Sequence, residues 1–258
     1  MKHADLVEVF GVDGVERWPL VPEDVTHPTS RRFITEVGVP SLEAPGASVT
    51  TSTENGGARL PAYRDRWDFD WPWSRTGAFD DWLLVAYCSW DGRAFLDGVT
   101  GTVHFVPDYD EPPRLMNSTI EDFTYFLYAF QRDRGRYEDD YVRVLAQLVS
   151  AEDDEAAGLA RRLLEHPSPA KSPDVEFVRR ALAYPSMASD DDREAVLELL
   201  ARTVAAKDLA IELHDVDPAP FVGDVGDVFS RDPELDLPSD FAGPWTHIFQ
   251  SVREGTMA

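Results

Sequence analysis

Three short apolar runs, separated by turn sequences, constrain the fold of this chain more than any other feature. The runs cover residues 82–88, 93–97 and 102–106, and the turns between them are Ser89–Gly92 and Gly98–Gly101. Short β-favouring segments that alternate with Asp-Gly and other glycine-containing turns are typical of an antiparallel meander. The sequence therefore predicts a three-stranded antiparallel sheet in this part of the chain.

The middle run predicts which side chains lie on which face of this sheet. Ala94 and Leu96 fall on one face. Arg93, Phe95 and Asp97 fall on the other. An alternation of this kind is expected where at least one face of a sheet is covered. We therefore expect another layer of the protein to pack against the sheet.

The strongest amphipathic helix in the sequence follows the third run. Residues 118–121 read Ser-Thr-Ile-Glu, the form of a capping box in which the serine and glutamate side chains satisfy backbone N–H groups of the first turn. Apolar residues then recur at helical spacing on one face, at Ile120, Phe123, Leu127 and Phe130. We predict a helix that begins at Ser118 and covers the sheet.

A second helix is predicted nearer the N-terminus. Pro28 suits the first turn of a helix, and Gly38 followed by Pro40 suits its end. Phe33 and Ile34 supply part of an apolar face between these two signals.

The sequence changes character after Phe130. Residues 132–140 are highly charged, and prolines then separate helical runs at 141–149, 155–164, 175–183 and 193–206, with a final short helix over 245–252. We predict two units from this change. The first is an α+β domain over residues 1–135, in which an antiparallel β-meander sheet is covered by helices. The second is a mainly helical C-terminal lobe or extension over residues 136–258.

The net charge restricts the kinds of partner that the chain can bind. Among its 258 residues, 48 are Asp or Glu and 24 are Lys or Arg, which gives a formal net charge of -24. Such a field repels nucleic acid and anionic membranes and attracts basic partners. A second interpretation stays open, in which the acidity only confers solubility or reflects an acidic or salt-adapted proteome.

The remaining composition indicates the compartment. The single cysteine, Cys88, lies in an apolar run, cannot form an internal disulfide and is expected to be a buried thiol. The N-terminal residues turn polar at once, and no apolar run approaches the roughly 18 residues of a membrane span. We therefore expect a soluble, cytoplasmic protein.

The sequence contains none of the common catalytic motifs. A P-loop, a dinucleotide-binding glycine pattern, a G-x-S-x-G motif and an H-E-x-x-H motif are all missing. Weaker candidates are His104 with Asp108 and Asp110, His214 with Asp215 and Asp217, and the carboxylate pairs Asp68/Asp70 and Asp80/Asp81. Closely spaced acids are expected in so acidic a chain, so we predict no enzymatic activity, no cofactor and no metal site.

Aromatic and acidic residues alternate in one segment, residues 63–73, that has no clear period. In one interpretation the rings plug the end of the sheet. In the other they form an exposed surface that binds a basic protein, because Trp and Tyr supply much interface energy and acids select a basic partner. For that surface we predict Trp67, Asp68, Asp70, Trp71 and Trp73, with Asp80, Asp81 and Asp91 near the same end of the sheet.

Three segments resemble the SUKH superfamily, in the branch called its fourth subfamily. Residues 29–40, Thr-Ser-Arg-Arg-Phe-Ile-Thr-Glu-Val-Gly-Val-Pro, are similar to the family pattern T-R-R-F-L-T-E-V-G-L-P. Residues 91–103 carry its Asp-Gly turn, Leu-Asp pair and Thr-Gly-x-Val sequence, and residues 117–123 resemble its N-S-S-L-e-x-F helix start. The resemblance covers residues 5–132, about half of the chain.

The resemblance implies an α+β fold and a non-enzymatic role. Bacterial members of the superfamily are mostly immunity proteins that bind and neutralise toxins, often nucleases or deaminases, and a eukaryotic branch regulates cell-wall synthesis through protein contacts. Our main hypothesis is an immunity protein that covers the active site or substrate groove of a basic toxin. The alternative is a regulatory or scaffolding module that binds an endogenous protein, with the helical lobe as its main surface.

Overall fold

The computed structural model describes residues 1–18, 21–42, 48–51, 59–67, 71, 73, 77–90, 92–134, 202, 205–229, 237–238 and 241–254. Every statement below refers to these residues, and the predicted helical runs at 141–149, 155–164 and 175–183 lie outside them.

A five-stranded antiparallel sheet forms the centre of the fold. Its strands follow the order of the chain: β3 (Val49–Thr51), β4 (Trp82–Cys88), β5 (Gly92–Asp97), β6 (Val103–Pro107) and β7 (Arg114–Asn117). The predicted meander is confirmed as β4–β6, and β3 and β7 extend it by one strand on each side. The fold is therefore of the predicted α+β class.

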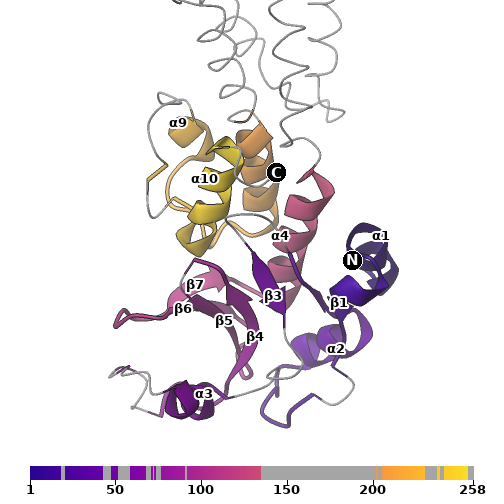
Figure 1. The fold of residues 1–258 in the computed structure, drawn as a ribbon, viewed down its shortest axis with the longest axis vertical. Helices are drawn as coiled ribbons and strands as arrows, with labels where there is room; N and C mark the ends of the chain where they lie inside the picture. Colours follow the sequence, from indigo (N-terminus) through magenta and orange to yellow (C-terminus); the bar gives the residue numbers. More distant parts are fainter. Residues whose placement is uncertain are drawn as a thin grey trace, which may run out of the picture.

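The two faces of the sheet pack against different layers. Ala94 and Leu96 belong to the larger hydrophobic core, whereas Phe95 belongs to a smaller cluster on the opposite face. The predicted alternation along β5 is therefore confirmed. Figure 1 shows α9 and α10 above the sheet and α3 below it.

The helix predicted after the sheet is α4 (Ile120–Arg132), and it packs its apolar face into the larger core. Its N-cap is Thr119 and not Ser118. The Thr119 hydroxyl accepts a hydrogen bond from the Asp122 amide (3.1 Å) and donates one to the Asp122 carboxylate (2.7 Å). The N-cap therefore lies one position further along than predicted, and Asp122 bonds the cap hydroxyl, while the Ser118 side chain is engaged elsewhere.

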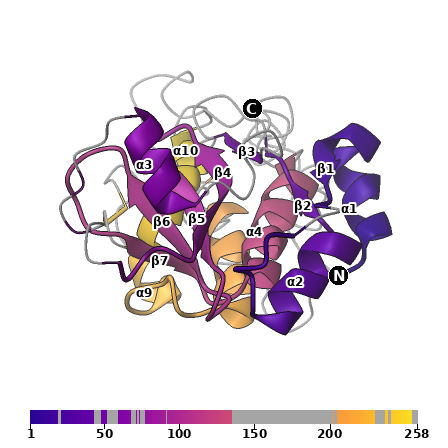
Figure 2. The same ribbon diagram turned by 90° about the horizontal axis from the view of Figure 1, so that it is seen from below.

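Two helices of the N-terminal segment pack beside α4. They are α1 (His3–Phe10) and α2 (Pro28–Glu36), and Figure 2 shows them grouped around α4 and away from α3. The predicted start and end of α2 are confirmed. Gly38 has a φ of 94°, and a Cβ there would lie 2.6 Å from the Glu16 carbonyl oxygen, so a glycine is required where the chain leaves α2. The chain then enters a small sheet of β1 (Val15–Glu16) and β2 (Val39–Pro40).

Elements near the C-terminus complete the larger core. A helix over residues 205–216, α9 (Val225–Phe229), η4 (Gly243–Trp245) and α10 (Thr246–Glu254) all contribute side chains to it. The Trp245 ring is fully buried, and its centroid lies 5.2 Å from that of Phe126 on α4. The final helix predicted at residues 245–252 is confirmed as α10. None of the helices in the described ranges is long and apolar enough to cross a membrane.

Candidate protein-binding surface

Aromatic side chains cover the second face of the sheet. Trp71, which is 1% exposed, joins Leu60 and Tyr63 of α3 (Leu60–Trp67) against Trp82 and Phe95. The rings of this cluster are in mutual contact: Trp71 stacks on Trp73 at 5.5 Å, and Trp73 meets Phe79 edge-on at 5.2 Å. Trp71 is therefore an interior ring in this structure, and Trp73 is half-buried.

The other predicted surface residues fall into two groups. Asp68, Asp70 and Asp91 lie outside the described residues, as does the side chain of Trp67, whose backbone ends α3. Asp80 and Asp81 are exposed in the turn before β4, and neither side chain forms an ion pair with another described residue. These two carboxylates are the predicted residues that the structure places on the surface.

Asp91 lies outside the described residues, so the grouping of Asp80, Asp81 and Asp91 at one end of the sheet stays a prediction. Asp81 directly precedes β4, which is 7 residues long. The pairing of β4 with β5 places its two termini at opposite ends of the sheet, because Trp82 pairs with Asp97 and Cys88 with Gly92.

Three segments that are distant in sequence meet at the end of the sheet near Asp81. The Gly98 amide donates a hydrogen bond to the Asp81 carbonyl (3.1 Å), and the Gly98 carbonyl accepts hydrogen bonds from the Thr26 amide (2.8 Å) and the His27 amide (2.9 Å). A Cβ at Gly98 would lie 2.4 Å from the Asp24 carbonyl oxygen. A glycine at this position therefore lets the segments with Asp24, Asp81 and Gly98 come together.

Two carboxylates at the Gly98 end of the sheet, Asp24 and Asp97, are held in place by the protein. Asp24 forms an ion pair with Arg59, whose Nε lies 2.7 Å from its Oδ2. Burial acts to raise the pKa of Asp97, but hydrogen bonds from the amides of Thr100 (3.0 Å) and Val99 (2.8 Å) outweigh it, so the pKa of Asp97 is lowered. With Asp80 and Asp81 nearby, this end presents a surface of negative charge.

The first weak catalytic candidate, His104, does not form a site with Asp108 and Asp110. Its ring stacks on Trp82 at 4.3 Å, and its Nε2 lies 2.9 Å from the Thr102 hydroxyl. Burial lowers the pKa of His104, and the charge of Asp97 opposes this only in part. Asp108 is instead paired with Arg93.

The second weak candidate, around His214, is also occupied by structural contacts. The Asp217 carboxylate accepts hydrogen bonds from the Ser118 amide and hydroxyl, and His214 meets the Phe221 ring edge-on. Across the described ranges, no group of three or more His, Cys, Asp or Glu side chains is placed to hold a metal ion.

Comparison with known proteins decides the family. The family model described as SUKH-4 immunity protein matches residues 1–174, two thirds of the chain. The chain belongs to the SUKH-4 immunity protein family. No curated protein and no solved structure matches the chain significantly. Membership in the family points to a role in toxin immunity and implies a toxin as the partner.

The SUKH-4 match ends before the last core elements begin. The helix over 205–216, α9 and α10 all lie beyond residue 174, yet they share the larger core with α4. Described residues outside the matched segment therefore belong to the same packed body as the SUKH-4 sheet.

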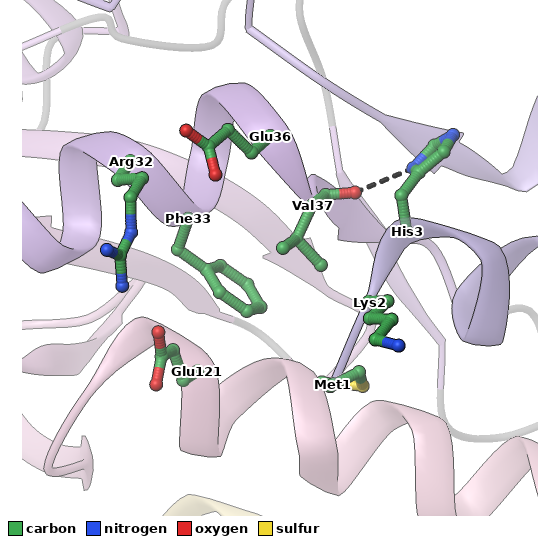
Figure 3. A pocket seen from close by; sticks show the side chains of 8 residues that line it. All are labelled: Met1, Lys2, His3, Arg32, Phe33, Glu36, Val37 and Glu121. Carbon is green, nitrogen blue, oxygen red and sulfur yellow. Dashed lines mark hydrogen bonds between the residues drawn. The ribbon is translucent and has the colours of Figure 1, made fainter.

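Two segments that carry the SUKH-4 resemblance also line a cavity of about 350 Å³. Phe33 and Val37 of the first segment form an apolar wall, and four charged side chains surround it: Lys2, Arg32, Glu36 and Glu121 (Figure 3). The His3 ring joins α1 to this region, because its Nδ1 lies 2.7 Å from the Val37 carbonyl oxygen. Charges of both signs around an apolar wall suit contact with a partner surface that is itself partly polar and partly apolar, and the described residues that line the cavity include no Ser, Thr or Cys.

Sequence reasoning missed one exposed aromatic residue, Tyr109. It lies between Asp108 and Asp110 in the loop from β6 to β7. The signal was present in the sequence, because an aromatic residue among acids between two strands has the same composition as the predicted surface at residues 63–73.

Proposed function

We propose that this SUKH-4 protein neutralises a cognate toxin of a polymorphic toxin system by binding it and covering its active site or substrate groove. The observation that carries the proposal is the family match over residues 1–174. The inhibition would need no bond to be made or broken, in keeping with the absence of catalytic motifs from the sequence.

The charge of the chain supports a basic toxin as the partner. A formal net charge of -24 favours association with a cationic surface and raises the rate of encounter through long-range attraction. Toxins that act on nucleic acid need such a surface, because Lys and Arg side chains neutralise the phosphates of the substrate. We therefore infer a toxin of the nuclease or deaminase type, inhibited in the cytoplasm of the cell that makes this protein.

The exposed carboxylates of Asp80 and Asp81 contribute to this attraction in our proposal. They are surface groups without an ion pair among the described residues, so their charge is available to a partner. Charges at the rim of an interface change mainly the association rate, whereas buried aromatic anchors supply most of the binding energy.

The experiment that tests the proposal starts from the native host. The full chain is affinity-purified, proteins that remain bound are identified by mass spectrometry, and the domain found is purified for activity assays. We expect a basic toxin domain whose activity on nucleic acid is lost at a one-to-one ratio with this protein. Recovery of an endogenous, non-toxic protein as the stoichiometric partner would instead support the regulatory alternative.

A further inference from the structure

Among the described residues, Tyr109 is the Phe, Tyr or Trp side chain most available to a partner protein. It is 52% exposed, and the other described Phe, Tyr and Trp rings are buried or half-buried. Its loop, residues 108–113, joins β6 to β7 and projects from the sheet (Figure 1). An exposed tyrosine at the tip of a projecting loop is the kind of side chain that anchors protein interfaces, because it buries a large area and loses little conformational entropy.

The base of this loop is tied to the body of the protein. Asp108 forms an ion pair with Arg93 of β5. The Arg93 Nε donates a hydrogen bond to the Tyr63 hydroxyl (2.6 Å), and its guanidinium carbon lies 5.6 Å from the centre of the Tyr63 ring and 5.7 Å from that of Tyr87. These contacts fix one side of the loop against the second face of the sheet.

The other side of the loop is also restrained. Pro112 and Pro113 limit the backbone, and the Glu111 carboxylate pairs with Arg114 at the start of β7. The Glu111 amide donates a hydrogen bond to the Tyr109 carbonyl (2.7 Å), which bends the chain at the tip. Because the loop is already restrained, it loses less conformational entropy when a partner binds, and this increases the affinity.

The charge next to the ring specifies the partner. Asp110 is exposed and forms no ion pair with another described residue, in contrast to Asp108 and Glu111. The loop therefore presents an aromatic ring and an uncompensated carboxylate side by side. The complementary surface is an apolar pocket with Lys or Arg at its rim.

Among the residues that the structure describes, none at the Gly98 end of the sheet forms an anchor of this kind. Its exposed apolar side chain is Val99, and its aromatic neighbour Phe79 is only partly exposed. Acidic groups without an aromatic anchor attract a basic protein but bury little apolar area against it. The two ends of the sheet thus differ in what they can contribute to binding.

We propose that Tyr109, with Asp110 beside it, is the anchor by which this protein holds its toxin, inserted into a basic-rimmed apolar pocket on the toxin surface. This inference rests on the proposed function. The Asp80–Asp81 turn accelerates the encounter, and the Tyr109 loop slows dissociation.

The test compares Tyr109→Ala and Tyr109→Phe with Val12→Ala in the full chain. Val12 is 71% exposed and lies in η1 (Val12–Gly14), so its truncation removes exposed apolar area away from the loop. The probe is the purified toxin domain recovered with the wild-type protein. We expect Tyr109→Ala to raise the dissociation rate about 30-fold, the loss associated with an interface hot spot, and Val12→Ala to leave it unchanged. Tyr109→Phe keeps the ring and retains most of the affinity.

A photo-crosslinking amino acid at position 109, with position 12 as the control, gives a second readout in the native host. We expect a covalent adduct with the toxin from position 109 alone. If the toxin co-purifies with the wild-type protein but dissociates from Tyr109→Ala at the wild-type rate, the assignment of Tyr109 as the anchor is wrong. The proposed function then still stands. If no toxin is bound by the wild-type protein, the proposed function fails and the anchor fails with it.

Discussion

Ser118 and Asp217 lie 99 positions apart in the sequence, yet the Asp217 carboxylate accepts hydrogen bonds from both the Ser118 amide (2.7 Å) and the Ser118 hydroxyl (2.8 Å). Asn117 donates a third to the same carboxylate (3.2 Å), and the Trp245 indole N–H in turn donates to the Asn117 side chain (3.0 Å). Asp217 is only 2% exposed. This buried polar junction fastens the C-terminal elements to the corner between β7 and α4.

The first prediction concerns this junction. Asp217→Ala should lower the free energy of unfolding by at least about 2 kcal/mol, because each buried donor left without an acceptor costs about 1–3 kcal/mol. Asp217→Asn keeps one acceptor oxygen, so its free energy of unfolding should fall by less than that of Asp217→Ala. Urea denaturation followed by circular dichroism measures both.

Two comparisons make this prediction specific. Asp80→Ala removes an exposed carboxylate and should change stability by no more than about 0.5 kcal/mol. A double-mutant cycle between Asp217→Ala and Ser118→Ala should give a coupling energy of about 0.5–3 kcal/mol. Strict additivity of the two changes would show that the Ser118 hydroxyl and the Asp217 carboxylate do not stabilise the protein through their mutual hydrogen bond.

The second prediction concerns the aromatic cluster on the other face of the sheet. Trp71→Ala should destabilise the protein by about 3–5 kcal/mol, the usual cost of truncating a buried tryptophan. Trp71→Phe fills part of the space and should cost less, which keeps the comparison measurable if the alanine variant does not fold. Tyr109→Ala is the control and should unfold like the wild-type protein. A fully stable Trp71→Ala variant would contradict the interior position of this ring.

The sheet and its main helix could be predicted because their signals are local. The turn sequences between residues 82 and 106 and the apolar period after Ser118 each depend on neighbouring residues. The addition of β3 and β7 could not be predicted in this way, because both are short and are stabilised by pairing with β4 and β6. The shift of the cap from Ser118 to Thr119 has a similar cause, since Asp217 competes for the serine.

The candidate surface was harder to predict than the fold. Trp71 and Tyr109 both lie among acids, and sequence spacing does not say which ring is buried. The difference arises from tertiary packing: the Trp71 side chain packs on the second face of the sheet, whereas the loop with Tyr109 leaves the sheet between two of its strands. Burial of this kind depends on contacts between distant residues.

The third prediction concerns the pH dependence of stability. Burial lowers the pKa of His104 below its usual value of 6.5, so the folded protein disfavours the charged imidazole. The unfolded chain then binds more protons than the folded one as the pH falls below about 6.5, and stability decreases over that range. The stability that depends on a neutral His104 is fully present above pH 6.5 and is lost as the pH falls toward the pKa of His104 in the folded state.

A His104→Gln variant isolates this contribution. The other histidines remain, so the difference between the variant and the wild-type protein reports on His104. Urea midpoints at pH 7.5 and pH 5 should fall less for His104→Gln than for the wild-type protein. An equal fall in both proteins would mean that His104 titrates alike in the folded and unfolded states.

The last prediction separates long-range attraction from anchoring. Asp80→Lys and Asp81→Lys each reverse an exposed charge at the Gly98 end of the sheet, so they should slow association with the toxin domain several-fold at low salt and leave dissociation almost unchanged. The effect should shrink as salt rises, because the Debye length falls from about 30 Å at 0.01 M to about 8 Å at 0.15 M. Asp13→Lys makes the same change in net charge on exposed η1. An equal slowing by Asp13→Lys would mean that only total charge matters and that the Asp80–Asp81 turn has no special part in the encounter.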